Sequence, residues 1–201
     1  MARRLKIVLA SGSPRRMRLM EQLGVPFEVV EPGDVEESVS LEPAEAVEKN
    51  ALAKAKSVAR DLGEGIVIGA DTVVVSGDKA FGKPRDPMEA RGMLRSLEGS
   101  VHSVLTGIAV VDARSGMIES DVVETRVTML PLSEADIEAY VATGEPLGKA
   151  GGYAIQGIGG VLVEGIEGCF YNVMGLPMSR MFEMLRGFGV DILRVAQMSN
   201  L

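Results

Sequence analysis

Residues 6–16 read Lys-Ile-Val-Leu-Ala-Ser-Gly-Ser-Pro-Arg-Arg, and this stretch decides the fold class. The short apolar run at 6–10 predicts a buried strand. Ser13 is a natural helix N-cap and Pro14 suits the first helical position, so the sequence predicts a helix directly after the strand. Apolar residues then recur at helical spacing until Gly24, which ends the helix. A strand that leads through a small turn into a helix is typical of an α/β protein.

Strand and helix patterns alternate along the rest of the chain. We expect a strand and then an acidic loop within 25–41, and helices at 43–62, at 86–97, at 133–143 and from residue 177 onward. We expect further strands at 66–69, 72–75, 101–111, 117–130 and 161–163. The sequence therefore predicts an α/β fold with a mixed β-sheet.

Composition excludes several classes of protein. The chain has 201 residues, which fits one domain or two closely joined lobes. Its net charge of −7 argues against a nucleic-acid partner, since such proteins carry a basic surface. One His and one Cys exclude a zinc site of several Cys and His ligands and an intrachain disulfide. Catalysis would therefore use carboxylates, lysines, arginines and hydroxyls.

Nothing in the sequence predicts export or a membrane partner. The apolar run near the start ends at Ala10, whereas a signal peptide needs about 7–15 apolar residues. No run approaches the ~18 residues that span a bilayer. With a single thiol, Cys169, the chain is expected in the cytoplasm.

Charge is segregated along the first part of the chain. Residues 1–18 carry only basic charges, and residues 19–48 carry only acidic ones. This pattern fits two solvated faces. It also fits an anion site beside a cation site, which a metal-bound phosphate substrate would need.

The turn Ser11-Gly12-Ser13 and the first helical turn after it form the first candidate site. The N–H groups and the positive dipole end of a helix attract anions. Arg15 and Arg16 oppose that dipole, so their placement suggests a bound anion as the missing partner, and a guanidinium suits phosphate oxygens. The alternative is that both arginines point to water. No P-loop or strict GxGxxG motif occurs.

Asp71 lies between two apolar runs, where an unpaired carboxylate would be costly. It could serve as a general base or a metal ligand at a strand end, or as a turn residue that caps its own backbone. Glu36 and Glu37 could supply a second carboxylate, or they could belong to a solvated acidic loop.

Two lysines and a glycine-rich segment complete the candidates. Lys54 and Lys83 could each contact phosphate as a point charge, although a helix-surface lysine such as Lys54 faces solvent by default. Residues 149–157 contain glycines that would let backbone approach a ligand, and Gln156 offers a donor and an acceptor, as a base-reading residue would. A plain hairpin is the alternative for this segment.

Taken together and in order, six segments resemble the Maf family, the nucleoside triphosphate pyrophosphatases associated with septum formation. They are LASGSPRR at 9–16, KA at 54–55, GADTVV at 69–74, GKPRD at 82–86, YAIQG at 153–157 and NVMGLP at 172–177. The resemblance runs from about residue 7 to about residue 193.

The resemblance implies a reaction and a set of roles. The family hydrolyses a nucleoside triphosphate to monophosphate and pyrophosphate with a divalent cation, here Mg²⁺ or Mn²⁺. Asp71 would be the general base and a metal ligand with Glu37, or with Glu36 because the loop length varies. The substrate-binding set would be Ser11, Ser13, Arg15, Arg16, Lys54 and Lys83. Arg16, Thr72 and Gln156 resemble the branch that acts on dTTP and UTP.

The resemblance also implies an elongated mixed sheet flanked by helices, with two lobes around a cleft as in inosine triphosphatase-like proteins, and a homodimer. We expect one domain over 1–195 and a loose tail at 196–201. Three alternative functions stay open: a nucleotide-binding regulator of cell division without useful turnover, a 7-methyl-GTP pyrophosphatase, and an enzyme that removes modified nucleotides.

Overall fold

The computed structural model describes residues 6–33, 35, 38 and 42–199. Its backbone divides into two compact units. The first unit contains Met1–Asp71, Thr106–Val123 and Gly175–Leu201, and the second contains Thr72–Leu105 and Glu124–Met174. Each unit is described by itself below. A single domain over 1–195 stays a prediction, as does the loose tail at 196–201.

The strands form one mixed sheet. They are β1 (Ile7–Ala10), β2 (Glu28–Val30), β3 (Ile66–Ser76), β4 (Lys79–Phe81), β5 (Val101–Asp112), β6 (Ile118–Met129) and β7 (Val163–Glu167). Their order is β2-β1-β3-β5-β6-β7, and β4 pairs with β3. β1 runs parallel to β2 and β3, whereas β4 is antiparallel to β3 and β7 is antiparallel to β6. The predicted α/β fold with a mixed sheet is confirmed.

Helices separate most of the strands. They are α1 (Pro14–Gln22), α2 (Pro43–Leu62), α3 (Pro87–Leu97), α4 (Glu134–Ala142), α5 (Phe170–Val173), α6 (Met178–Gly187) and α7 (Ile192–Ser199), with the 3₁₀ turns η1 (Ala150–Gly152) and η2 (Ile158–Leu162). Local signals set many of their ends: Ser133 and Asp136 form a capping box at α4, and Gly63 ends α2 with a φ of 64°. Within the described ranges, no helix combines the length and apolar composition needed to cross a membrane.

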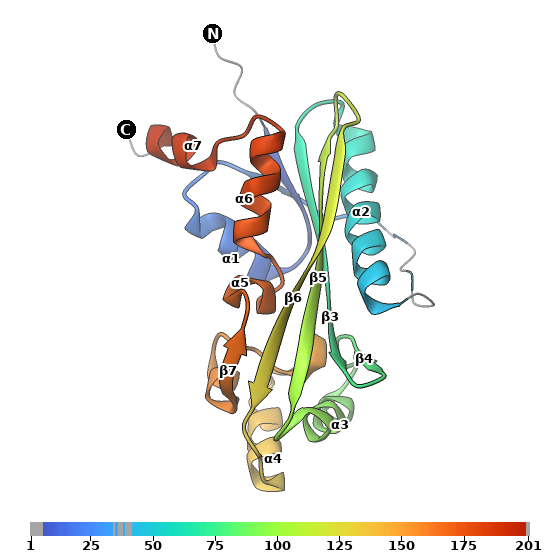
Figure 1. Ribbon diagram of the computed structural model, residues 1–201, viewed down its shortest axis with the longest axis vertical. Coiled ribbons are helices and arrows are strands. Elements are labelled where there is room, and N and C mark those ends of the chain that lie inside the picture. The colour runs from blue at the N-terminus through green and yellow to red at the C-terminus, as the bar shows by residue number, and fades with distance from the viewer. Residues whose placement is uncertain (1–5, 34, 36–37, 39–41, 200–201) are drawn as a thin grey trace. The chain divides into compact units, whose positions relative to one another are not determined.

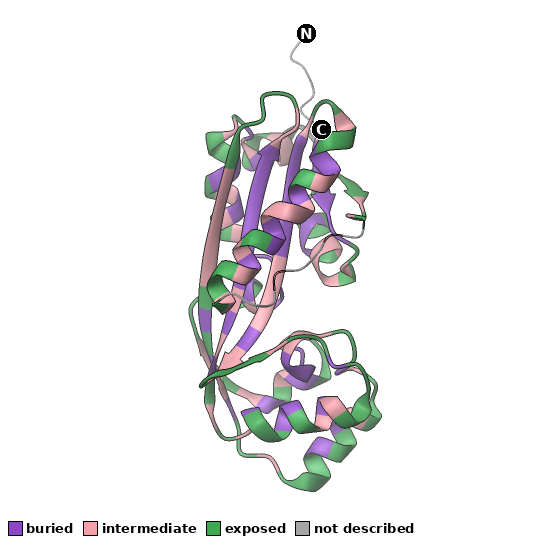
Figure 2. Ribbon diagram, turned by 90° about the vertical axis from the view of Figure 1, so that its right-hand side faces the viewer, coloured by how far each residue is buried: buried purple, intermediate pink, exposed green. Residues whose placement is uncertain are grey.

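The first unit packs helices against its strands on both sides. α2 covers one face, where its small residues meet β1, β3 and β5 in a cluster of Val8, Ala10, Ala51, Ala55, Val58, Ala59, Val67, Ala109 and Val111. Alternation along β1 turns Ile7 and Leu9 to the opposite face, on the side of α1 and α6 (Figure 1). The strands at the centre of this unit are therefore buried (Figure 2).

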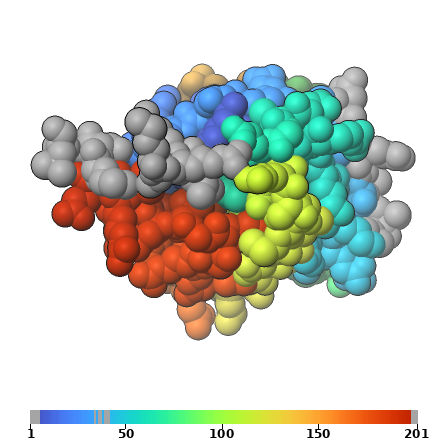
Figure 3. Space-filling model, turned by 90° about the horizontal axis from the view of Figure 1, so that it is seen from above, coloured from blue at the N-terminus to red at the C-terminus, as the bar shows by residue number. Residues whose placement is uncertain are grey.

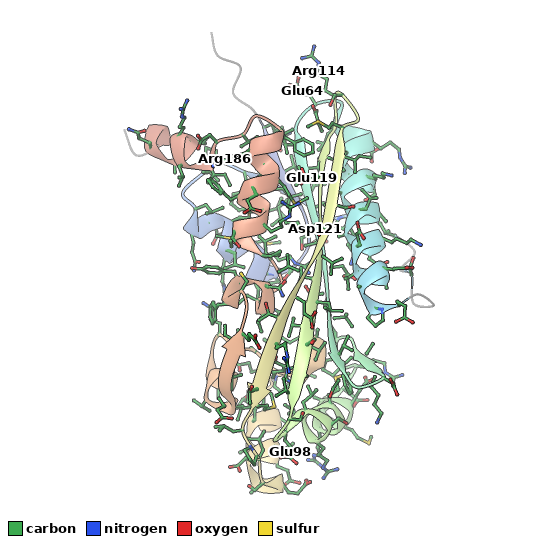
Figure 4. The ribbon with its side chains drawn as sticks, viewed as in Figure 1. Glu64, Glu98, Arg114, Glu119, Asp121 and Arg186 are labelled. Carbon is green, nitrogen blue, oxygen red and sulfur yellow. The ribbon has the colours of Figure 1, made fainter. Side chains whose placement is uncertain are left out.

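Polar contacts on β6 attach a helix to each of its faces. Figure 4 labels Glu119 and Asp121 on this strand beside α6, and Arg180 of α6 binds them over 2.9 Å and 2.5 Å. Between them, the Ser120 hydroxyl donates to Glu48 of α2 over 2.6 Å. Successive side chains of a strand point to opposite faces, so one short segment of β6 orients both helices.

The tight turn between β5 and β6 closes one end of the first unit. In Figure 3 this yellow-green turn lies beside the teal segment that follows α2. The Ala113 N–H donates to the Gly65 carbonyl over 2.9 Å. This bond fixes the end of the hairpin to the chain that enters β3.

The second unit has a core of its own, to which β3, β5, β6, α3, α4 and the glycine-rich loop contribute. Its buried members are Val74, Leu94, Leu97, Val104, Val127, Met129, Ile137, Tyr140, Tyr153 and Leu162. His102 of β5 is 2% exposed, and its Nε2 lies 2.7 Å from the hydroxyl of Tyr153. The only imidazole of the chain therefore has a place in the packing of the second unit.

Two sequence predictions of structure are wrong. The strand expected at 161–163 is mostly the turn η2, and the strand itself, β7, begins at Val163 because its pairing with β6 sets its position. The two strands expected at 66–69 and 72–75 are one continuous strand, β3. Asp71 consequently lies within a strand and not at a strand end.

Candidate active site

The turn between β1 and α1 is organised by the Ser11 hydroxyl. Ser11 is 4% exposed, and its Oγ accepts hydrogen bonds from the Ser13 N–H over 3.2 Å and from Arg16 Nη1 over 3.4 Å. Ser13 occupies the predicted N-cap position with extended backbone, but its side chain makes no capping bond within the described part of the chain. The first turn of α1 contains no acidic residue. This helix end is therefore suited to an external anion.

Arg16 is held against the protein instead of pointing to water. Its Nε donates to the Gly175 carbonyl over 2.7 Å, in addition to the bond to Ser11. Burial lowers the pKa of Arg16 to about 10, while the charge of Asp71 raises that pKa and the charge of Arg15 lowers it. The guanidinium is still a cation at neutral pH, but it sits where water solvates it poorly. An anion bound nearby would stabilise it.

Two glycines let α2 lie directly on the sheet beside the candidate base. A Cβ at Gly69 of β3 would overlap the Ala51 carbonyl oxygen and lie 2.9 Å from the Ala55 N–H. A Cβ at Gly107 of β5 would overlap the Val47 carbonyl. These close approaches need glycine, since any side chain would push the helix away. The helix is thereby brought close to β3 two residues before Asp71.

The Asp71 carboxylate receives a hydrogen bond at each oxygen from α2. Asn50 Nδ2 donates to Oδ2 over 3.0 Å, and Lys54 Nζ donates to Oδ1 over 2.7 Å. The side chains of Lys54 and Asp71 are 16% and 19% exposed. The alternatives of a self-capping turn aspartate and of a solvent-facing Lys54 are therefore wrong.

Asn50 is a site residue that the sequence patterns did not predict. It is 5% exposed, and its Oδ1 accepts the Ser38 N–H over 2.8 Å while its Nδ2 contacts Asp71. An N–H donor at one end of the amide requires the oxygen there, so the nitrogen must face the carboxylate. A signal was present: Asn50 and Lys54 are four residues apart and border the apolar stripe of α2, where asparagine is unfavourable in a helix interior.

The first unit therefore brings together Ser11, Ser13, Arg16, Lys54 and Asp71 of the predicted set, while Arg15 lies half-buried beside Arg16 in the first turn of α1. Glu36 and Glu37, the predicted second metal carboxylate, lie outside the described residues.

The other predicted residues belong to the second unit. Thr72 follows Asp71 along β3, Lys83 is exposed between β4 and α3, and Gln156 is exposed in the loop before η2. Within this unit, the Gly151 N–H donates to the Gly82 carbonyl over 3.1 Å. That bond links the loop of Lys83 to the glycine-rich loop that leads to Gln156.

A model of the family described as Maf-like protein matches residues 6–188 of this sequence. The chain belongs to the Maf family. The match includes each segment on which the resemblance was based, from the turn at 9–16 to the segment at 172–177.

Relatives within the Maf family are similar over almost their full length. A protein of Pelotomaculum thermopropionicum is 50% identical over 189 residues, which is 94% of this chain and 99% of the relative. A protein of Moorella thermoacetica is 51% identical over 189 residues, or 93% of this chain and 97% of the relative. Both relatives are named dTTP/UTP pyrophosphatase. Among solved structures, the Ham1 protein of Staphylococcus aureus aligns with a TM-score of 0.45 at 19% identity, over 64% of this chain and 72% of that protein.

Proposed function

We propose that the chain hydrolyses dTTP and UTP to the nucleoside monophosphate and pyrophosphate. The observation that carries this proposal is the Asp71 carboxylate, which Asn50 and Lys54 hold close enough to Arg16 to raise the pKa of that guanidinium. A fixed carboxylate beside cations suits the attack of water on a phosphate. The relatives about half identical to the chain carry the name of this activity.

Cations and backbone N–H groups of the first unit would bind the triphosphate. The Arg16 guanidinium, which the Gly175 carbonyl and the Ser11 hydroxyl orient, would contact phosphate oxygens. Arg15 and the first turn of α1 would add charge and N–H donors at the same helix end. Ser13 would donate its hydroxyl to phosphate. We also expect Lys83, a residue of the second unit, to contribute a positive charge.

Asp71 would act as the general base. A carboxylate has lone pairs to spare when each oxygen accepts one hydrogen bond, so Asp71 retains acceptor capacity for a water molecule. As the water oxygen forms its bond to the α-phosphorus, Asp71 takes one water proton. The bond between the α-phosphorus and the bridging oxygen breaks, and pyrophosphate leaves with that oxygen. Positioning and electrostatics would supply most of the acceleration.

A divalent cation fits the donor set of this site. In the described ranges, no group of three or more Asp, Glu, His or Cys residues could hold a metal ion without other ligands. Mg²⁺ is commonly held by one or two carboxylates together with substrate phosphates and water. Asp71 would supply the carboxylate, and Glu37 or Glu36 a second one. When bound, Mg²⁺ or Mn²⁺ would offset the charge of the phosphates.

Base selection would depend on Arg16, Thr72 and Gln156. Uracil and thymine present the same pair of groups, a carbonyl oxygen and an N–H, and a glutamine amide can pair with both. We also expect a cytoplasmic homodimer, and the mass of the protein in solution, measured by light scattering, tests the dimer.

A substrate panel tests the proposed function. Pyrophosphate release would be measured with dTTP, UTP, CTP, GTP, 7-methyl-GTP and modified uridine triphosphates, each with Mg²⁺ or Mn²⁺. We expect the highest kcat/KM for dTTP and UTP. Preference for 7-methyl-GTP or for a modified nucleotide would contradict the assigned substrate, and nucleotide binding without any release would favour a regulator.

A further inference from the structure

The backbone on both sides of Gln156 donates hydrogen bonds to the side chains of two residues, Tyr140 and Glu145. Gln156 lies in the second unit between Ala154 and η2. Its own side chain is exposed, and no hydrogen bond within the described part of the chain holds its amide. The position of this amide therefore depends on the backbone that carries it.

Glu145 holds the chain after Gln156. Its Oε1 accepts the Ile158 N–H over 3.0 Å, and its Oε2 accepts the Gly159 N–H over 2.7 Å. Hydrogen bonds from N–H groups to a carboxylate are stronger than those between neutral groups. Burial alone would raise the pKa of Glu145, but the bonds from Gly159, Tyr140 and Ile158 outweigh it, so that the pKa is lowered. Both oxygens consequently act as acceptors at neutral pH.

Tyr140 of α4 joins this carboxylate to the chain before Gln156. Its hydroxyl donates to Glu145 Oε2 over 2.8 Å and accepts the Ala154 N–H over 3.1 Å. Tyr140 is 4% exposed, so its ring is fixed by the core of the second unit. The two side chains thus form one hydrogen-bonded group with anchors on either side of Gln156.

Glycines make this arrangement possible. Gly157 has a φ of 110°, and a Cβ there would overlap Glu145 Oε1. A Cβ at Gly159 would overlap the Tyr140 hydroxyl and lie 2.6 Å from the Ala154 carbonyl oxygen. The loop closes onto Tyr140 and Glu145 at positions where only glycine fits. The glycine-rich pattern is therefore explained by a specific contact of the loop.

We propose that Tyr140 and Glu145 are positioning residues for base selection, and that they hold Gln156 where its amide can distinguish uracil or thymine from cytosine. This inference rests on the proposed function for the identity of the bases. A glutamine amide contains both a donor and an acceptor, so it can pair with any of these bases unless its place is fixed. Fixing the backbone on both sides of Gln156 limits which groups on the edge of the base its amide can reach.

The test compares kcat/KM for UTP with kcat/KM for CTP in Tyr140→Phe and Glu145→Gln. The first change removes only the hydroxyl, and the second turns one carboxylate oxygen into a group that cannot accept an N–H. We expect the ratio of UTP to CTP to fall about tenfold in each, the effect of one hydrogen bond of ordinary strength. Glu138→Gln is the matched control, because Glu138 lies on α4 with Tyr140 and its side chain is 58% exposed.

A double variant separates positioning from general loss of packing. If Tyr140 acts through Gln156, Tyr140→Phe should reduce the ratio much less in a Gln156→Ala background than in the unmodified protein. Equal loss in both backgrounds would overturn the proposal. The proposal would also be overturned if a folded Tyr140→Phe or Glu145→Gln variant had a ratio of UTP to CTP within about twofold of that of the unmodified protein.

Binding provides a readout that needs no turnover. The dissociation constants of α,β-imido-UTP and α,β-imido-CTP, measured by calorimetry, should show the same change of ratio in the variants. If the unmodified protein binds the uridine analogue preferentially, the variants lower this preference and no pyrophosphate is released, the proposed function fails and this inference stands. If it binds both analogues equally well, the inference is overturned whatever the turnover.

Discussion

Lys54 Nζ donates a hydrogen bond to Asp71 Oδ1 over 2.7 Å, and both side chains are mostly shielded from water. We also expect Lys54 to contact phosphate as a point charge, in which case one side chain serves both the base and the substrate. Lys54 and Asn50 are one helical turn apart on α2. Their common helix therefore sets the orientation of the carboxylate.

Asn50→Ala should lower kcat about tenfold or more and change KM little. The variant keeps the phosphate-binding cations but removes the bond that orients Asp71 Oδ2. Asn50→Asp should lose at least as much, because it can still accept the Ser38 N–H but cannot donate to Asp71. Steady-state kinetics check both, with the exposed Lys56→Ala of the same helix as control. An unchanged kcat in Asn50→Ala would contradict the role of Asn50 in orienting Asp71.

Arg16→Lys should raise KM for UTP about tenfold and also lower kcat. Lysine keeps the charge, but its ammonium lacks the planar fork that reaches Gly175, Ser11 and a phosphate together. Arg18→Lys on the same helix is the control, since Arg18 is exposed. Identical kinetics in the two variants would contradict the phosphate-binding role of Arg16.

Gly69→Ala should destabilise the protein by about 1–3 kcal/mol and reduce activity, because the added methyl forces α2 away from β3. Gly92→Ala is the matched control. Gly92 is exposed within α3 and has nothing within 4 Å of an added Cβ, so this change should stabilise by about 0.5–1 kcal/mol. Chemical denaturation measures both, and a neutral Gly69→Ala would contradict the close approach of α2.

His102 should titrate near pH 4. Burial lowers its pKa from 6.5 to about 4, and its Nδ1 has no hydrogen-bond partner within the described residues. In the unfolded chain the imidazole takes up a proton near pH 6.5, whereas in the folded protein it does so only near pH 4. The free energy of unfolding therefore decreases as pH falls from about 6.5 to about 4, by up to about 3 kcal/mol.

The single imidazole signal in an NMR titration checks this value directly, since the chain has one histidine. A midpoint near 6.5 would contradict the burial of His102.

Local signals made much of the fold predictable. Pro14 and Gly24 delimit α1, and Ser133 with Asp136 opens α4, because these residues act within one turn of the helix end. The position of Asp71 was misread because Gly69-Ala70 looks like a break in a strand. Glycine is instead needed at 69 because α2, the helix that precedes β3, packs directly on this position.

The candidate site was predictable residue by residue but not as an arrangement. Arginines at a helix N-terminus and a lone aspartate between apolar runs contradict local rules, and such contradictions are visible in sequence. The bond from Asn50 to Asp71 and the group of Tyr140 and Glu145 around Gln156 depend on tertiary packing. The type and local sequence of a residue do not predict which side chains it contacts in the folded protein.

Asp71→Asn tests the central claim most directly. The amide keeps the size of the side chain but cannot take a proton from water, so pyrophosphate release from UTP should fall about 10³-fold, the contribution of a general base. Binding of α,β-imido-UTP, measured by calorimetry on the same preparation, should stay within about threefold, since the cations that hold the phosphates remain. Turnover close to that of the unmodified enzyme, with binding intact, would contradict the assignment of Asp71 as the base.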